Sequence, residues 1–139
     1  MDNTMRTTTV TATLLLALLS TPALAENREH VTLNDTQKTY VLGHMKTMLE
    51  AIAQINQHLA DQQPERVAIL VKDMQKASHQ SKPKGLGKSF PDGFRAFSRQ
   101  MNQHWKTLMT PTSDISKVNS EMSSILTQCN ACHRSYKLK

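Results

Sequence analysis

Apolar side chains recur along residues 35–136 at alternating steps of three and four residues. This spacing is typical of amphipathic α-helices whose apolar stripes pack together, because an α-helix repeats every 3.6 residues. Runs that contain proline, glycine or short polar side chains interrupt the pattern at residues 62–64, 81–88 and 110–114. The pattern therefore predicts four helices in a single domain.

Each predicted helix has an apolar stripe and a polar start. Thr32 or Asn34 can cap the first helix, Pro64 suits the first position of the second, and Ser89 or Asp92 can open the third. No stretch has the alternation of a strand. Four stripes with mostly short connections predict an all-α fold, an antiparallel up-down-up-down four-helix bundle. In chain order the stripes are Val41, Met45, Met48, Ile52, Ile55, Leu59; Val67, Leu70, Met74, Ala77; Phe94, Phe97, Met101, His104, Leu108; and Ile115, Val118, Met122, Ile125, Cys129, Cys132, Tyr136.

Cys129, Cys132 and His133 form a Cys-x-x-Cys-His motif on the fourth stripe, and these are the two cysteines of the chain. Two thiols three residues apart can each form a thioether with a haem vinyl group, and the following histidine can supply an axial nitrogen to the iron. A thioredoxin-like pair favours a strand–helix–strand context, and a structural zinc site needs four ligands. The sequence offers neither, so the motif predicts one covalently bound haem c. Because the stripe continues through the motif, all three side chains are expected to face the bundle interior.

The N-terminal 25 residues have the features of a secretory signal peptide. Arg6 precedes a short apolar run, which is too short to span a bilayer, and residues 23–25 offer small side chains to a signal peptidase. Met1 and Met5 can both serve as the initiator. Cleavage after residue 25 leaves a cytochrome domain of residues 26–139. The predicted location is the bacterial periplasm, where haem is attached to Cys-x-x-Cys-His motifs.

The chain is basic, with a formal net charge of +6 that removal of residues 1–25 leaves unchanged. A basic surface favours acidic protein partners and accelerates encounter with them. The expected partners are redox proteins of the periplasm or membrane with an acidic docking surface. Nucleic acid is not an expected partner, since the chain is exported and poor in aromatic residues. No nucleophile–base pattern is present, so the chain is not expected to be an enzyme.

The signal peptide, four amphipathic helices and C-terminal haem motif together resemble the cytochrome c′ family, which includes low-spin relatives with a methionine ligand. The family ending Cys-x-x-Cys-His-x-x-Tyr-Arg is matched from Cys129 to Tyr136, followed by Lys137 in place of arginine. In the first helix Tyr40 aligns with a family aromatic, which puts Met45 at the distal position. The arginine that often follows this aromatic, near a haem propionate, is here Val41.

The resemblance implies His133 as proximal iron ligand, Met45 as distal ligand, and a haem pocket formed by Tyr40, Val41, Met48, Phe97 and Tyr136. With Met45 bound, the protein is expected to carry one electron on a six-coordinate haem. With an open distal site it would instead bind nitric oxide or carbon monoxide, as cytochrome c′ does. His44 is a second distal candidate, whereas His104 lies too far along its helix.

Two further alternatives stay open at this point. A haem-free module could bind copper through His44, Met45 and Met48. Family members often form homodimers through the first two helices, but the outer faces of these helices carry Lys46 and Glu50 and offer no clear apolar patch.

Overall fold

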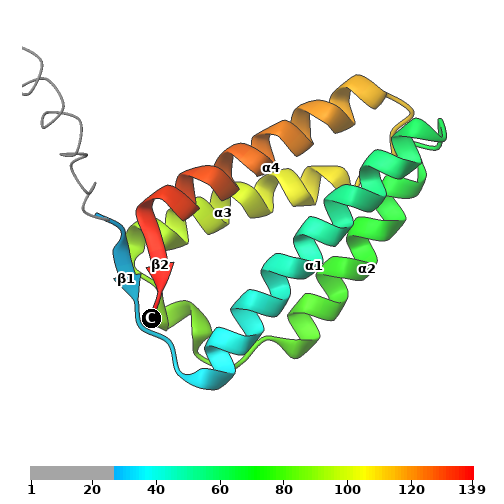
Figure 1. Ribbon diagram of the computed structural model, residues 1–139. Helices are drawn as coiled ribbons and strands as arrows, with labels where there is room; N and C mark the ends of the chain where they lie inside the picture. The colour runs from blue at the N-terminus through cyan, green and yellow to red at the C-terminus, as the bar shows by residue number, and fades with distance from the viewer. Residues whose placement is uncertain (1–26) are drawn as a thin grey trace, which may run out of the picture.

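The computed structural model describes residues 27–139, and the predicted signal peptide, residues 1–25, lies outside them. The described chain is mostly helical, with four α-helices, which is consistent with a helical bundle (Figure 1). None of the helices in this part of the chain is long and apolar enough to cross a membrane. The elements are β1 (Glu29–Val31), α1 (Asp35–Ala60), α2 (Arg66–Ser81), the 3₁₀-helix η1 (Leu86–Ser89), α3 (Asp92–Leu108), α4 (Ile115–Ser135) and β2 (Tyr136–Leu138).

Side-chain caps fix the starts of two helices. The Asn34 side chain accepts a hydrogen bond from the Gln37 amide at 2.9 Å, and the Gln37 side chain accepts one from the Asn34 amide at 3.2 Å. This reciprocal capping box satisfies two amides that the helix itself cannot pair. Asp114 caps α4 by accepting from the amide three residues later. Helix α2 begins at Arg66 rather than at Pro64 as the sequence suggested.

The helices pack as two pairs, α1 with α2 and α3 with α4. Figure 1 shows the two pairs meeting at the end with the α1–α2 and α3–α4 loops and lying further apart at the other end. The predicted stripes supply most of the core between them, and Ala51, Ala68, Val71 and Trp105 are buried beside them. Of the predicted stripe residues, Ala77 is exposed, and Phe97 and His104 belong to neither core cluster. The main cluster consists of Met48, Ala51, Ile52, Ile55, Leu59, Val67, Val71, Met74, Trp105, Leu108, Val118, Met122 and Ile125.

A second, smaller cluster fills the far end of the molecule. It is built from Val31, Leu33, Val41, Leu86 and Phe94, all of them less than one tenth exposed. The segment after α2 therefore contributes a core residue, although its lysines and glycines suggested a solvated loop. Its turn uses Gly85 in the left-handed region, at φ 76°, where glycine has no steric penalty.

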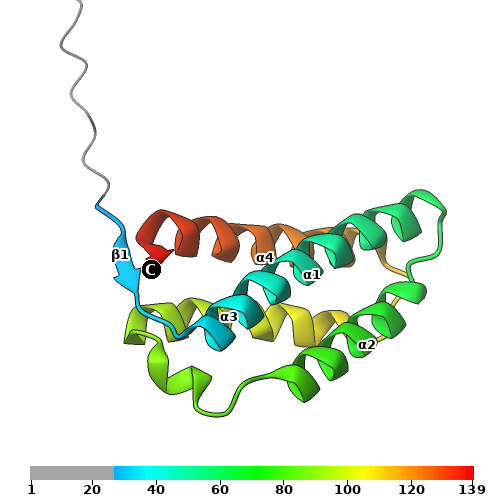
Figure 2. The same ribbon diagram turned by 60° about the horizontal axis from the view of Figure 1, so that its bottom comes forward.

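Two short strands close this end, and the sequence did not predict them. β1 and β2 pair in parallel, with Glu29 opposite Tyr136 and Val31 opposite Leu138. Figure 1 shows the two strands side by side, and Figure 2 shows the C-terminus beside β1. Three residues are too few to display a period-two pattern. The pairing ties the segment before α1 to the three residues after α4.

Candidate functional site: a divided pocket beside the Cys-x-x-Cys-His motif

The two cysteines lie in the last two turns of α4, and both are half-buried and free of a disulfide. The sulfur of Cys129 lies 3.7 Å from the sulfur of Met101 on α3. Cys132 packs against the second apolar cluster. Residues three apart lie on one helix face, so the two thiols share a face of α4. Cys129 nevertheless lines neither of the two spaces described next, whereas Cys132 lines the smaller one.

His133 is exposed rather than turned into the bundle, which corrects the sequence-based expectation. Successive residues of an α-helix are rotated by about 100°, so His133 cannot share the inward direction of Cys132. Its backbone carbonyl accepts a hydrogen bond from Arg28, at 3.4 Å, in the segment before β1. The imidazole still borders a pocket, described next, together with Cys132.

This smaller pocket has a volume of about 350 Å³. It brings together Met45 from α1, Cys132 and His133 from α4, and Tyr136 from β2. The predicted proximal ligand, one predicted thioether position and the predicted distal ligand thus line one pocket. The remaining lining residues are Arg28, Leu42, Phe94, Lys137 and Leu138.

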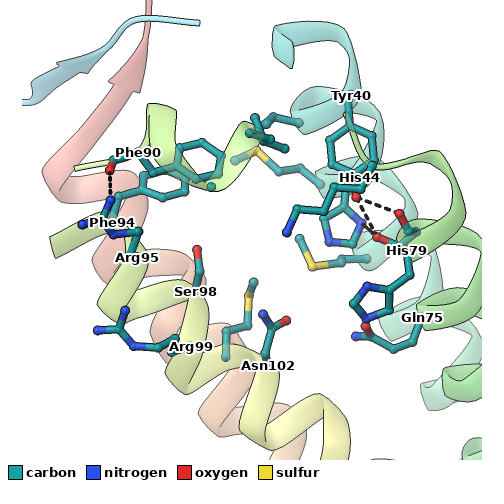
Figure 3. Close-up of a pocket in the computed structure, with 18 of the residues that line it drawn as sticks. Tyr40, His44, Gln75, His79, Phe90, Phe94, Arg95, Ser98, Arg99 and Asn102 are labelled. Atoms are coloured by element: carbon teal, nitrogen blue, oxygen red, sulfur yellow. Dashed lines mark hydrogen bonds between the residues drawn. The ribbon is translucent and has the colours of Figure 1, made fainter. Parts of the chain in front are cut away.

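A larger cleft of about 500 Å³ lies between α1, α2 and α3 (Figure 3). Tyr40, Val41 and Met48, predicted as haem-pocket residues, line this cleft and not the smaller pocket. Met45 and Phe94 line both spaces.

Phe97, the other predicted pocket residue, lines neither space. Its ring instead meets Tyr136 edge-on, with centroids 6.4 Å apart. Phe97 is therefore placed to support a wall of the smaller pocket, through Tyr136, rather than to touch a ligand there.

Basic side chains dominate the polar part of the larger cleft. Lys82, Arg95, Arg99 and Lys106 line it, and among the described residues no aspartate or glutamate lines either space. Arg95 is partly neutralised by an ion pair with exposed Asp92. The space therefore has an apolar interior and a positive polar wall.

A hydrogen-bond chain orders the α1–α2 side of the cleft. The Tyr40 hydroxyl lies 3.0 Å from both oxygens of Ser78, and the Ser78 hydroxyl lies 3.0 Å from Nδ1 of His44 (Figure 3). Burial lowers the pKa of His44, and the positive charges of Lys82 and His79 lower it further. His44 is therefore a neutral, anchored side chain near neutral pH.

The thiols are held in their protonated form. Burial raises the pKa of Cys129, and burial together with the neighbouring Cys129 raises the pKa of Cys132 to about 11. Protonated thiols can sit beside apolar walls at low cost, whereas thiolates cannot.

His104 has a partner of its own. Its Nδ1 lies 2.7 Å from the Glu121 carboxylate on α4, and both side chains are partly buried. This pairing accounts for a polar residue on the third apolar stripe and leaves His104 outside both spaces, as the sequence suggested.

Sequence reasoning missed several lining residues, among them Phe90, Phe94, Ser78, His79 and Lys82. Phe94 was visible on the third stripe and could have been assigned to the pocket. The others come from the end of α2 and from the connection to α3, where no periodic pattern exists. Within residues 27–139 no group of three or more histidine, cysteine or acidic side chains is arranged to hold a metal ion.

Comparison of the chain with protein-family models, curated proteins and solved structures found no significant match. The assignment therefore depends on whether these residues fit a haem. The volumes of the two spaces fall in the range of cofactor sites. Their apolar interior and the positive wall of the larger cleft suit a flat apolar group that carries two carboxylates. Cys132 on the smaller pocket, with Cys129 one turn before it on α4, supplies thiols that could attach such a group, so the residues fit.

Proposed function

We propose that the chain is an exported c-type cytochrome of the periplasm, an antiparallel up-down-up-down four-helix bundle that transfers single electrons and is not an enzyme. Cys129 and Cys132 would hold one haem c covalently, with His133 as proximal and Met45 as distal ligand. Haem iron supplies a one-electron couple, whose potential a methionine ligand raises.

The observation that best supports this proposal is that Met45 lines both the smaller pocket and the larger cleft. Met45 lies on the same pocket as Cys132 and His133 and also borders the larger cleft. A group attached to α4 in the smaller pocket would therefore lie beside the thioether of Met45. Met48 and Met101 border the larger cleft alone, which makes them weaker candidates.

The role of the remaining residues follows from their chemistry. Tyr40, Val41, Met48 and Tyr136 would exclude water from the site, which increases the strength of every electrostatic interaction inside it. The basic surface supports docking to acidic redox proteins of the periplasm or membrane. Nucleic acid is not a proposed partner.

The optical spectrum of the ferrous protein, matured with haem in a bacterial periplasm, tests the assignment. Narrow, split visible bands are expected from a low-spin iron with methionine bound. Met45→Ala should convert them to the broad band of a high-spin iron. Met48→Leu and Met101→Leu are matched controls, because each removes a thioether near the site, and both should keep the wild-type bands. A wild-type spectrum in Met45→Ala would contradict ligation by Met45.

A five-coordinate haem that binds nitric oxide or carbon monoxide is the second candidate function. The open cleft beside Met45, lined on that side by Val41 and Met48, supports it because a small neutral gas has room to enter. A high-spin spectrum of the wild-type protein that shifts on addition of carbon monoxide would favour this candidate. Absence of covalent haem after periplasmic expression would contradict both the electron-transfer and the gas-binding function. It would favour a metal site at His44, Met45 and Met48.

Self-association is also part of the proposal. Leu42 and Leu49 on α1 are 51% and 66% exposed, and Ile69 on α2 is 64% exposed. These apolar side chains, which the sequence pattern did not single out as a patch, could contribute to a homodimer through α1 and α2. Analytical ultracentrifugation of the wild-type protein and of Leu49→Gln would detect the homodimer, because the variant should have the lower molecular mass.

A further inference from the structure

The end of α2 is a basic wall of the larger cleft. Lys82 and His79 both line the cleft, and both act electrostatically on His44 of α1. Lys82 ends α2 as its C-cap. Neither the Lys82 nor the His79 side chain has a hydrogen bond or ion pair to another described residue, so both side chains remain available to a ligand.

The titratable and charged side chains around this wall come from three parts of the chain. Helix α1 contributes Tyr40 and the neutral His44, the end of α2 contributes His79 and the C-cap Lys82, and α3 contributes its two arginines and Lys106. Arg95 is already bound to Asp92 and to the Phe90 carbonyl, the latter at 3.1 Å. In Figure 3 the guanidinium groups of Arg95 and Arg99 project from α3 away from His44 and His79.

Building on the proposed haem attachment, we propose that Lys82 and His79 bind the carboxylates of the haem propionates. The positive wall has no acidic residue of the described chain beside it in the cleft. Met45 and Phe94 line both this cleft and the smaller pocket that contains Cys132, so the two spaces adjoin at these side chains. A group attached at Cys132 would reach the wall where the two spaces adjoin, on the side of the cleft where Ser78 holds His44.

This assignment explains how a propionate could be bound although Val41 stands where cytochromes of the family that the chain resembles often have an arginine. Helix α1 lines the cleft with no lysine or arginine. The compensating charge comes instead from the end of α2, whose Lys82 ammonium can form a charge-assisted hydrogen bond to a carboxylate. Lysine is a point charge without the fork of arginine, so one propionate oxygen at a time is the expected partner.

Titration of the propionates in the ferric, haem-loaded protein tests the proposal. With ¹³C in the propionate carboxyls, infrared spectroscopy follows their protonation separately from that of the protein carboxyls. A nearby cation lowers the pKa of a carboxyl by about 1–3 units. Lys82→Gln should therefore raise a propionate midpoint by about one pH unit, and His79→Gln should raise it by less. Both side chains are exposed, so neither change threatens the fold.

Lys76→Gln is the matched control, because Lys76 is an exposed lysine of the same helix that does not line the cleft. It should leave the midpoints unchanged. Equal midpoints in wild type and Lys82→Gln, on a chain that carries haem, would overturn this inference alone. Binding of inorganic phosphate to the haem-loaded protein that depends on Lys82 would also overturn it, since propionates would already occupy the wall. A chain without covalent haem would overturn the proposed function and this inference together.

Discussion

The hydroxyl of Tyr136 lies directly over Gly93 in the first turn of α3, at the place where a Cβ atom of residue 93 would be. Gly93→Ala must therefore displace the ring that closes the smaller pocket. We expect the free energy of unfolding to fall by about 1–3 kcal/mol, the usual cost of overpacking. Urea unfolding followed by circular dichroism measures the change.

Two further variants separate this contact from the general effect of removing a glycine. Gly43→Ala, in the middle of α1 with nothing within 4 Å of the new Cβ, should raise the free energy of unfolding by up to about 1 kcal/mol. Combining Gly93→Ala with Tyr136→Phe removes the hydroxyl oxygen and should restore most of the lost stability. If the double variant were no more stable than Gly93→Ala, the contact would not be the cause.

The helical part of this fold was predictable, because stripes such as Ile52–Ile55–Leu59 display the helical period over many turns. The Cys-x-x-Cys-His motif and the position of Met45 were likewise visible in the sequence. The exposure of His133 could also have been predicted, because the residue after Cys132 is rotated by about 100° from it on the helix. The basic wall at Lys82 and the Gly93–Tyr136 contact were not predictable. Both depend on how separate elements are placed relative to one another, which periodicity does not encode.

The strand pair should contribute stability out of proportion to its length. Val31 is 1% exposed and belongs to the second apolar cluster, so Val31→Ala should lower the free energy of unfolding by about 2 kcal/mol. Amide exchange at Tyr136–Leu138 should become faster, because β1 and β2 pair only with each other. His30→Ala, at the exposed neighbouring position, should change stability by less than about 0.5 kcal/mol. Equal losses in the two variants would refute a role for the buried side chain.

The hydrogen bond between His104 and Glu121 should be stronger than the exposed ion pair of Lys46 with Glu50. Its side chains are 33% and 21% exposed, against 78% and 56% for Lys46 and Glu50 on α1. Double-mutant cycles with glutamine replacements should give a coupling energy of about 1 kcal/mol for the first pair. The second pair should give less than about 0.5 kcal/mol. Equal couplings would mean that burial does not strengthen the bond between α3 and α4.

The thiols of the folded, haem-free chain should react slowly. With the pKa of Cys132 raised from 9.0 to about 11, the thiolate fraction at pH 8 falls about a hundredfold. The greater nucleophilicity of the more basic thiolate recovers about tenfold of this, so the net rate should be about tenfold lower. Alkylation of the wild-type chain by iodoacetamide, with the modification of Cys132 followed by peptide mass spectrometry, measures it against the same chain in urea. The alkylation rate of the folded chain should keep rising tenfold per pH unit between pH 8 and pH 10, whereas the rate of the unfolded chain levels off above pH 9.

Equal rates of the folded and unfolded chains at pH 8 would show that α4 leaves the thiol accessible and ionisable. If the thiols react slowly in the folded chain, the proposed attachment of haem should be fastest before α4 packs against α3.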